Sequence, residues 1–141
     1  MPAGHKNKTI ATLLASTVGA AGLHRFYLHG WRDRWAWLHL ASLPLSAVGG
    51  IVGNKLGPAW AMVLISPFIL SLLAALLEAL VLGLTPDSKW DAKYNPASGR
   101  KSESAWPLAL ILVLTLAGGM GGLIFVISRS FDLMFTGGSY G

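Results

Sequence analysis

Long apolar segments separated by short polar stretches run along this chain of 141 residues. When the sequence is divided at its charged residues and at its Gly and Pro positions, four apolar segments result, at about 9–28, 35–53, 58–83 and 106–127. An α-helix crosses a bilayer core with about 20 mainly apolar residues. Hydrocarbon cannot hydrogen-bond the backbone, and the alternating polarity of barrel strands is missing from the sequence. The pattern therefore predicts an all-α integral membrane protein, a bundle of four transmembrane helices, or of three if one segment does not cross.

The segment at 35–53 has the weakest pattern. Pro44 and three glycines interrupt it, and His39 and Ser42 dilute its apolar character. A re-entrant or interfacial segment is the alternative to a full crossing there.

The segment at 58–83 is the longest, and it contains Pro67. A proline at that place predicts a kink, with Ser66 or Ser71 able to donate to the carbonyl that the proline leaves free. The expected organisation is a membrane domain at 1–84, a polar loop at 85–105, a further transmembrane helix at 106–128 and an interfacial or disordered tail at 129–141. Residues 5–22 also have the order of a secretory signal, but their apolar run leads straight into HRFYL, so we expect them to remain as the first helix.

The composition supports a membrane protein. Charged residues make up 12% of the chain, against roughly a quarter in soluble domains. The net charge is +5, but the cations are scattered through the linkers, so membrane lipids with anionic headgroups are the expected counter-charge and nucleic acid is not an expected partner. If all four segments cross, seven Lys and Arg fall on the side of the 24–34 turn and four on the other, which favours a cytoplasmic turn.

The stretch HRFYLHGWRDRW, residues 24–35, concentrates aromatic rings and arginines. Both residue types settle at the boundary between membrane and water. The residues expected at the lipid interface are Trp31, Arg32, Arg34, Trp35, Trp90 and Trp106.

The same stretch resembles the TM-two domain, a family of small membrane proteins with a Gly-x-His-Arg-Phe-Tyr-Leu-Gly turn. The residues that carry the resemblance are Gly22, His24, Arg25, Phe26, Tyr27 and Leu28, with His29 in the place of the final glycine and Gly30 one position later. The resemblance covers about residues 6–83, with 40–57 as an expanded middle section. It implies little about activity, because the family is known by topology more than by a reaction, and some animal members are connected to signalling.

Glu78 stands about five residues inside the end of an apolar segment, at a depth where an unpaired carboxylate is costly. The resemblance also implies an acidic residue in a helix of the family. We expect Glu78 to be level with His24 and Arg25 and to form a buried ion pair that fixes the helix register. The alternatives are a role in proton or ion handling and a site for the cation of a partner.

Small residues recur at every fourth position in three segments. Such ridges allow close approach of helix backbones, which drives association in lipid. The expected helix-packing residues are Ala11, Ala15 and Gly19, then Ser71, Ala75, Ala79 and Gly83, and finally Gly118 and Gly122.

No motif of a metalloprotease, phosphate loop or nucleophile elbow appears, there is no cysteine, and the four histidines lack metal-site spacing. The sequence therefore predicts no enzyme activity, no cofactor and no metal. The expected function is that of a small accessory or structural protein of the bacterial inner membrane, which packs its helices against itself or a larger complex. The alternative is a proton- or ion-coupled transporter or channel component that uses Glu78 and His24.

Overall fold

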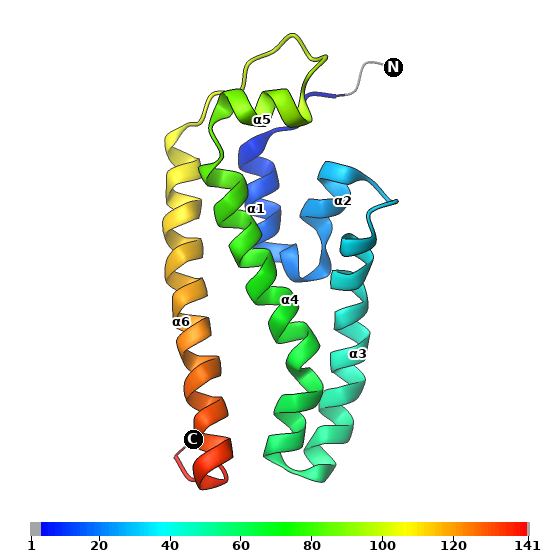
Figure 1. The fold of residues 1–141 in the computed structure, drawn as a ribbon, viewed down its shortest axis with the longest axis vertical. Helices are drawn as coiled ribbons and strands as arrows, with labels where there is room; N and C mark the ends of the chain where they lie inside the picture. Colours follow the sequence, from blue (N-terminus) through cyan, green and yellow to red (C-terminus); the bar gives the residue numbers. More distant parts are fainter. Residues whose placement is uncertain (1–3, 141) are drawn as a thin grey trace.

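The computed structural model describes residues 4–140, and within this range no strand occurs. The elements are α1 (Lys8–Val18), a 3-10 turn η1 (Gly19–Ala21), α2 (Leu23–His29), α3 (Arg34–Leu56), α4 (Pro58–Leu84), α5 (Asp87–Tyr94) and α6 (Trp106–Thr136). Among these elements, α3, α4 and α6 are long and apolar enough to cross a membrane. In Figure 1, α4 and α6 run along most of the molecule, and α3 runs along its lower part, starting below α2. The all-α membrane bundle is confirmed, with three crossing helices.

The segment at 9–28, predicted as one crossing helix, turns back on itself. α1 ends at Val18, and Gly22 has a left-handed backbone with φ of +75°, from which α2 begins. Lys6, just before α1, donates from Nζ to the carbonyl of Leu28, near the end of α2. The two ends therefore lie together, and the segment enters and leaves at one end of the molecule (Figure 1). We call α1, η1 and α2 the re-entrant pair.

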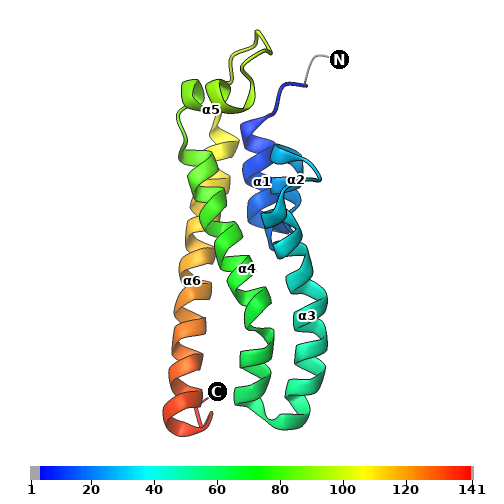
Figure 2. The ribbon, with the colours of Figure 1, turned by 45° about the vertical axis from the view of Figure 1, so that its right-hand side comes forward.

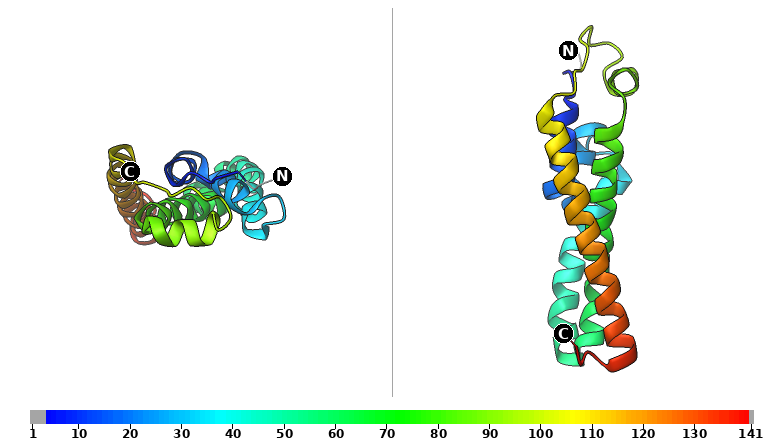
Figure 3. Two further views of the ribbon diagram at one scale, coloured as in Figure 1. Left: turned by 90° about the horizontal axis from the view of Figure 1, so that it is seen from above. Right: turned by 90° about the vertical axis from the view of Figure 1, so that its left-hand side faces the viewer.

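The tip of the re-entrant pair lies at the middle of α4. The hydroxyl of Ser71 donates to the carbonyl of Ala20 at 2.8 Å, and Ser71 is halfway between Pro58 and Leu84. Figure 2 shows the pair beside the upper half of α4 only. The small residues Ala11, Ala15, Ala75 and Ala79 are almost fully buried where α1 meets α4. In Figure 3 the three crossing helices form a row, with the re-entrant pair against one side of it.

The weakest segment by sequence forms a continuous crossing helix, α3. Its glycines do not break the helix but let it approach α4. A Cβ on Gly49 would clash with the carbonyl oxygen of Leu64, and one on Gly53 would clash with the Cα of Ala61. The backbones of α3 and α4 are therefore in direct contact in the half of the molecule that lacks the re-entrant pair.

Pro67 lies inside α4, as the sequence predicts. The hydroxyl of Ser66 donates to the carbonyl of Val63 at 2.7 Å, the group that a proline four residues later leaves free. The amide of Phe68, the residue after the proline, donates to the hydroxyl of Ser46 on α3 at 2.9 Å. Both helices thus contribute to satisfying the backbone at the proline.

The stretch 85–105, predicted as a polar loop, contains the helix α5 and folds over the N-terminal residues. Trp90, expected at the lipid interface, is instead fully buried and donates from Nε1 to the carbonyl of Lys6 at 3.0 Å. Lys8 forms an ion pair with Asp87. Hydrogen bonds from Asn95 and Ser102 lower the pKa of Asp91 to about 2. Residues 4–7, 30–33 and 85–105 together form what we call the cap end.

The tail at 129–141 is helical over most of its length, because α6 continues to Thr136. Asp132 forms an ion pair with Arg129 one turn before it and accepts from the hydroxyl of Thr136 one turn after it. Gly137, with φ of +68°, ends the helix. Residue 141 lies outside the described residues.

The re-entrant pair also changes the division of charge. The expected ratio of seven to four assumed that every segment crosses. With the pair folded back, the cap half carries nine of the eleven Lys and Arg residues, and only Lys55 and Arg129 lie towards the opposite end (Figure 1). The nine are Lys6, Lys8, Arg25, Arg32, Arg34, Lys89, Lys93, Arg100 and Lys101.

Replacement of Gly49 by alanine tests the contact between α3 and α4. We expect Gly49→Ala to lower the free energy of unfolding by roughly 1–3 kcal/mol, because the added methyl group meets backbone that cannot move aside. Gly50→Ala is the matched control, since a Cβ there comes no closer than 3.4 Å to Ile65. Unfolding in mixed micelles, followed by circular dichroism, measures both, and equal losses in the two variants would contradict the contact.

Candidate functional site

A cluster of ionisable side chains lies inside the membrane-spanning part of the cap half. Arg25 donates from Nη1 to Glu78 Oε1 at 2.7 Å, and His24 Nε2 lies 2.5 Å from Glu78 Oε2. His24 and Arg25 belong to the first turn of α2, and Glu78 lies about two turns beyond Ser71 on α4. The structure thus brings together the three residues of the ion pair expected from the sequence, and it does so because α2 ascends beside the second half of α4.

Arg25 also contacts a second carboxylate, which the sequence analysis missed. Its Nε donates to Asp33 Oδ2 at 3.0 Å, and His29 Nδ1 lies 3.2 Å from the same oxygen. Asp33 is the N-cap of α3 and accepts from the amide of Trp35 at 2.8 Å. An aspartate directly before an apolar run is the usual signal of a helix N-cap. That signal would have placed Asp33 at the same boundary as Arg25.

A second branch of the cluster reaches the middle of α4. His24 is fully buried, and its ring centroid is 5.8 Å from that of His39 on α3. His39 Nδ1 lies 2.6 Å from the hydroxyl of Ser71. That hydroxyl gives its one hydrogen to the carbonyl of Ala20, so His39 must donate from Nδ1. His24 Nδ1 has no hydrogen-bond partner among residues 4–140. We call Arg25, Asp33, Glu78, His24, His39 and Ser71 the polar cluster.

The two charges deepest in the polar cluster balance each other, because Arg25 and Glu78 carry opposite charges. An uncompensated charge at this depth is costly. Asp33 adds a second carboxylate to Arg25 at the cap end, and His24 adds a second polar contact to Glu78.

The polar cluster opens sideways into a groove between α3 and α4. The groove has a volume of about 420 Å³, and its lining includes Trp35, Leu38, Leu70, His39 and Glu78. The side chain of Glu78 is 33% exposed. The carboxylate is therefore accessible from the apolar face of the protein as well as in contact with Arg25 and His24.

The family turn motif forms α2 and its two flanking glycines. A Cβ on Gly22 would lie 2.6 Å from the carbonyl oxygen of Ala36, so the left-handed turn and the close approach to α3 both require glycine. Gly30, with φ of +78°, ends α2. The remaining motif residues serve different contacts. Leu28 is buried, Tyr27 accepts at its hydroxyl from the amide of Asn7, and Phe26 packs against Trp31 and Trp37.

The expected packing residues fall into two groups. Gly19 faces α4, where a Cβ would lie 2.7 Å from that of Ala75, and Gly83 faces Leu112 of α6. Gly118 and Gly122 are not brought into any contact, because a Cβ on either would meet nothing within 4 Å in the described part of the chain. Gly49 and Gly53 are packing glycines that were not predicted. In the sequence they were interpreted as interruptions of the segment at 35–53.

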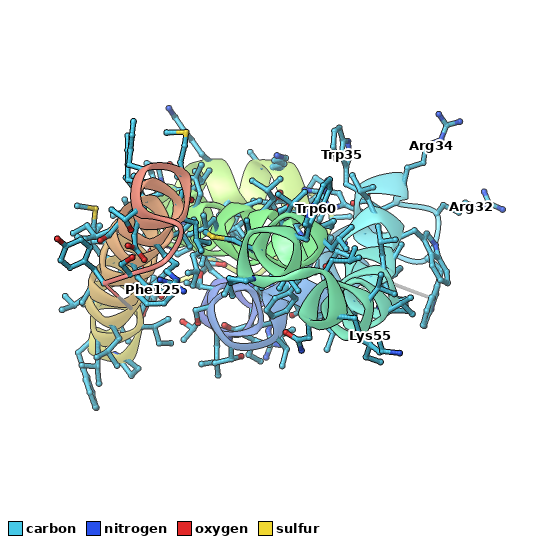
Figure 4. The ribbon with its side chains drawn as sticks, turned by 90° about the horizontal axis from the view of Figure 1, so that it is seen from below. Arg32, Arg34, Trp35, Lys55, Trp60 and Phe125 are labelled. Atoms are coloured by element: carbon cyan, nitrogen blue, oxygen red, sulfur yellow. The ribbon has the colours of Figure 1, made fainter. Side chains whose placement is uncertain are left out.

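Most of the residues expected at the lipid interface are exposed. Trp31, Trp35 and Trp106 are each more than 60% exposed, and Figure 4 shows Arg32 and Arg34 pointing away from the helices. Trp90 is the exception described above. The exposed members lie at the cap end or in the first helical turn below it (Figure 1).

Residues 4–54 match the family model of the TM2 domain. This match confirms the resemblance inferred from the HRFYL stretch. It covers the re-entrant pair and nearly all of α3, and it ends before α4, so Glu78 lies outside the matched residues although the sequence analysis extended the resemblance to about residue 83. No curated protein and no solved structure matched the chain in the corresponding searches.

Replacement of Glu78 by glutamine tests the ion pair. We expect Glu78→Gln to lower the free energy of unfolding by roughly 1–3 kcal/mol, less than for a fully buried pair because the side chains are partly exposed. The loss arises because Arg25 then keeps only Asp33 as a charged partner. Glu103→Gln is the matched control, since Glu103 is exposed at the cap end. Unfolding in mixed micelles measures both variants, and wild-type stability of Glu78→Gln would show that the pair adds nothing.

Proposed function

We propose, with residues 4–54 as a TM2 domain, that this integral membrane protein is a small accessory or structural protein that catalyses no reaction. It acts through helix packing with itself or with a larger membrane complex in the bacterial inner membrane. Its partners are membrane lipids and other membrane proteins, and nucleic acid is not among them. The polar cluster then serves to fix the register of α2 against α4.

The observation that carries this proposal is the outward position of three glycines of α6, whereas Gly119 faces Leu76 of α4. In the rest of the bundle, close helix contacts coincide with inward-facing glycines, as at Gly49, Gly53 and Gly83. A Cβ on Gly118, Gly121 or Gly122 meets nothing within 4 Å among residues 4–140. Glycine weakens a helix unless close packing uses it. A helix from another molecule against this part of α6 would give these glycines the same role.

The distribution of Lys and Arg supports an orientation. Nine of the eleven lie in the cap half. Cytoplasmic loops of membrane proteins carry an excess of Lys and Arg. The proposal therefore has the cap end in the cytoplasm and the turn between α3 and α4 on the other side.

Cysteine cross-linking tests the packing of α6, and the natural chain contains no cysteine. We expect Gly118→Cys in native membranes to form a disulfide-linked dimer with an oxidant, because the glycine ridge lets two helices approach closely. A bifunctional cross-linker on the same variant would give a heavier product if the neighbour is another protein. Gel mobility and mass spectrometry identify the product.

Met120→Cys is the control for this experiment, because it is at nearly the same depth but about 200° further around α6. Cross-linking at 118 but not at 120 supports a packed interface. Equal cross-linking at both positions would indicate random collision, and none at either would argue against an α6 interface.

A second candidate function, proton or ion handling within a transporter or channel, is favoured by the second branch of the polar cluster. His24 contacts Glu78 and packs against His39, which bonds to Ser71 at the middle of α4, and the buried His24 Nδ1 has no partner within residues 4–140. The polar cluster extends from one end only. Passage across the whole membrane therefore requires further groups, which places this function behind the first.

Proton flux into liposomes tests the second function. If the chain conducts protons, Glu78→Gln should abolish acidification of a trapped pH-sensitive dye under a potassium diffusion potential, because the carboxylate no longer exchanges a proton with His24. Glu103→Gln should leave the flux unchanged. If protein-loaded liposomes acidify no faster than empty liposomes, conduction of protons by this chain alone is excluded.

A further inference from the structure

The two halves of the molecule present different cross-sections to the two leaflets. In the cap half, α1, α2, α4 and α6 lie side by side, and α3 begins below α2, near the tip of the pair, whereas in the opposite half of the described chain α3, α4 and α6 continue (Figures 1 and 2). The difference is the re-entrant pair, whose tip stops at Ser71 in the middle of α4.

The re-entrant pair also packs against two of the crossing helices. In the opposite half, α3 and α4 touch through Gly49 and Gly53. In the cap half, the tip contacts both of them, with Gly19 against Ala75 of α4 and Gly22 against Ala36 of α3. The pair therefore packs against α3 and α4 in one leaflet, whereas in the other leaflet the backbones of these two helices are in direct contact.

The extra area is substantial on the scale of a lipid. An α-helix with its side chains is about 10–12 Å across, so the one added helix occupies roughly 80–110 Å² in one leaflet. The opposite half has a groove of about 400 Å³ between α4 and α6, but its lining is mainly apolar, as at Met62 and Leu133, and acyl chains can fill it. The groove does not replace the area of the missing helix.

The re-entrant pair is held at a fixed depth. Trp31, in the turn before α3, and Trp35, in the first turn of α3, are exposed, and Arg32 and Arg34 point away from the helices (Figure 4). These side chains favour the headgroup region. The wider half therefore stays in the cap-side leaflet.

We propose that this protein is a wedge that prefers curved membranes in which the cap-side leaflet is the convex one. Its partner in this interaction is a lipid surface of defined curvature. In a convex leaflet the lipids have more area per headgroup than in the concave leaflet, and a molecule that is wider on the convex side fits this difference. The preference belongs to the monomer and does not depend on the packing of α6.

The test uses one chain in its two orientations. Lys101→Cys, at the exposed cap end, carries a fluorophore, and the chain is reconstituted into phosphatidylcholine and phosphatidylglycerol vesicles of mixed diameter. A membrane-impermeant quencher separates molecules with the cap outside from those with the cap inside, vesicle by vesicle. We expect the density of cap-outside molecules to rise roughly twofold or more from the largest to the smallest vesicles, and that of cap-inside molecules to fall.

A label at Lys55→Cys, on the opposite turn, is the control for orientation, because its quenching must be the reverse of that at residue 101. The same dependence on diameter in both orientations would overturn the proposal, and so would no dependence in either. Neither result affects the cross-linking expected at Gly118, so the wedge and the α6 interface fail or succeed separately.

Discussion

A chain that turns back inside a bilayer must satisfy the backbone groups of its turn without water, and this constraint determines the rest of the structure. At the tip of the re-entrant pair, the amide of Gly22 donates to the carbonyl of Gly19 at 2.7 Å, and the hydroxyl of Ser71 donates to the carbonyl of Ala20. The turn fits only because Gly22 adopts a left-handed backbone and because α4 presents small residues, Ala75 and Ala79, to α1. The helices α3 and α4 are therefore shaped around a break in the first apolar segment.

The sequence contained a signal for this break. The run from Thr9 to Leu23 is fifteen residues, which span only about 22 Å in a helix, and His24 and Arg25 follow at once. A bilayer core of about 30 Å is thicker than that. A segment extended to Leu28 is long enough to cross, so the shortness of the uncharged run was not evident. Conversely, the glycines of 35–53 suggested a broken segment, although Gly49 and Gly53 are there because α4 is close. Hydropathy and glycine content do not distinguish a break from a contact.

The contact between Glu78 and α2 was easier to predict from the sequence, because few charges were available at that depth to neutralise an acid. The sequence predicts a first helix that crosses the membrane, whereas the structure brings these residues to the same level with a helix that turns back. The contacts of Asp33 with Arg25 and His29, the burial of Trp90 and the groove beside Glu78 were not predicted, since each depends on how separate segments meet. Trp90 in particular looks like an interfacial residue until the N-terminal residues supply the carbonyl of Lys6 that its indole needs.

The positions of the cations explain why the first segment returns rather than crosses. Lys6 and Lys8 precede it, and Arg25, Arg32 and Arg34 end it or follow it. If the segment crossed, one of these groups would have to pass through the membrane to the side that Lys and Arg avoid. By turning back, the chain keeps both groups on one side at the cost of an irregular backbone in the bilayer. That cost is reduced by Gly22 and Ser71. The re-entrant pair, the asymmetric cross-section and the nine cations of the cap half are thus connected, because a segment with cations at both ends is most easily accommodated in a single leaflet.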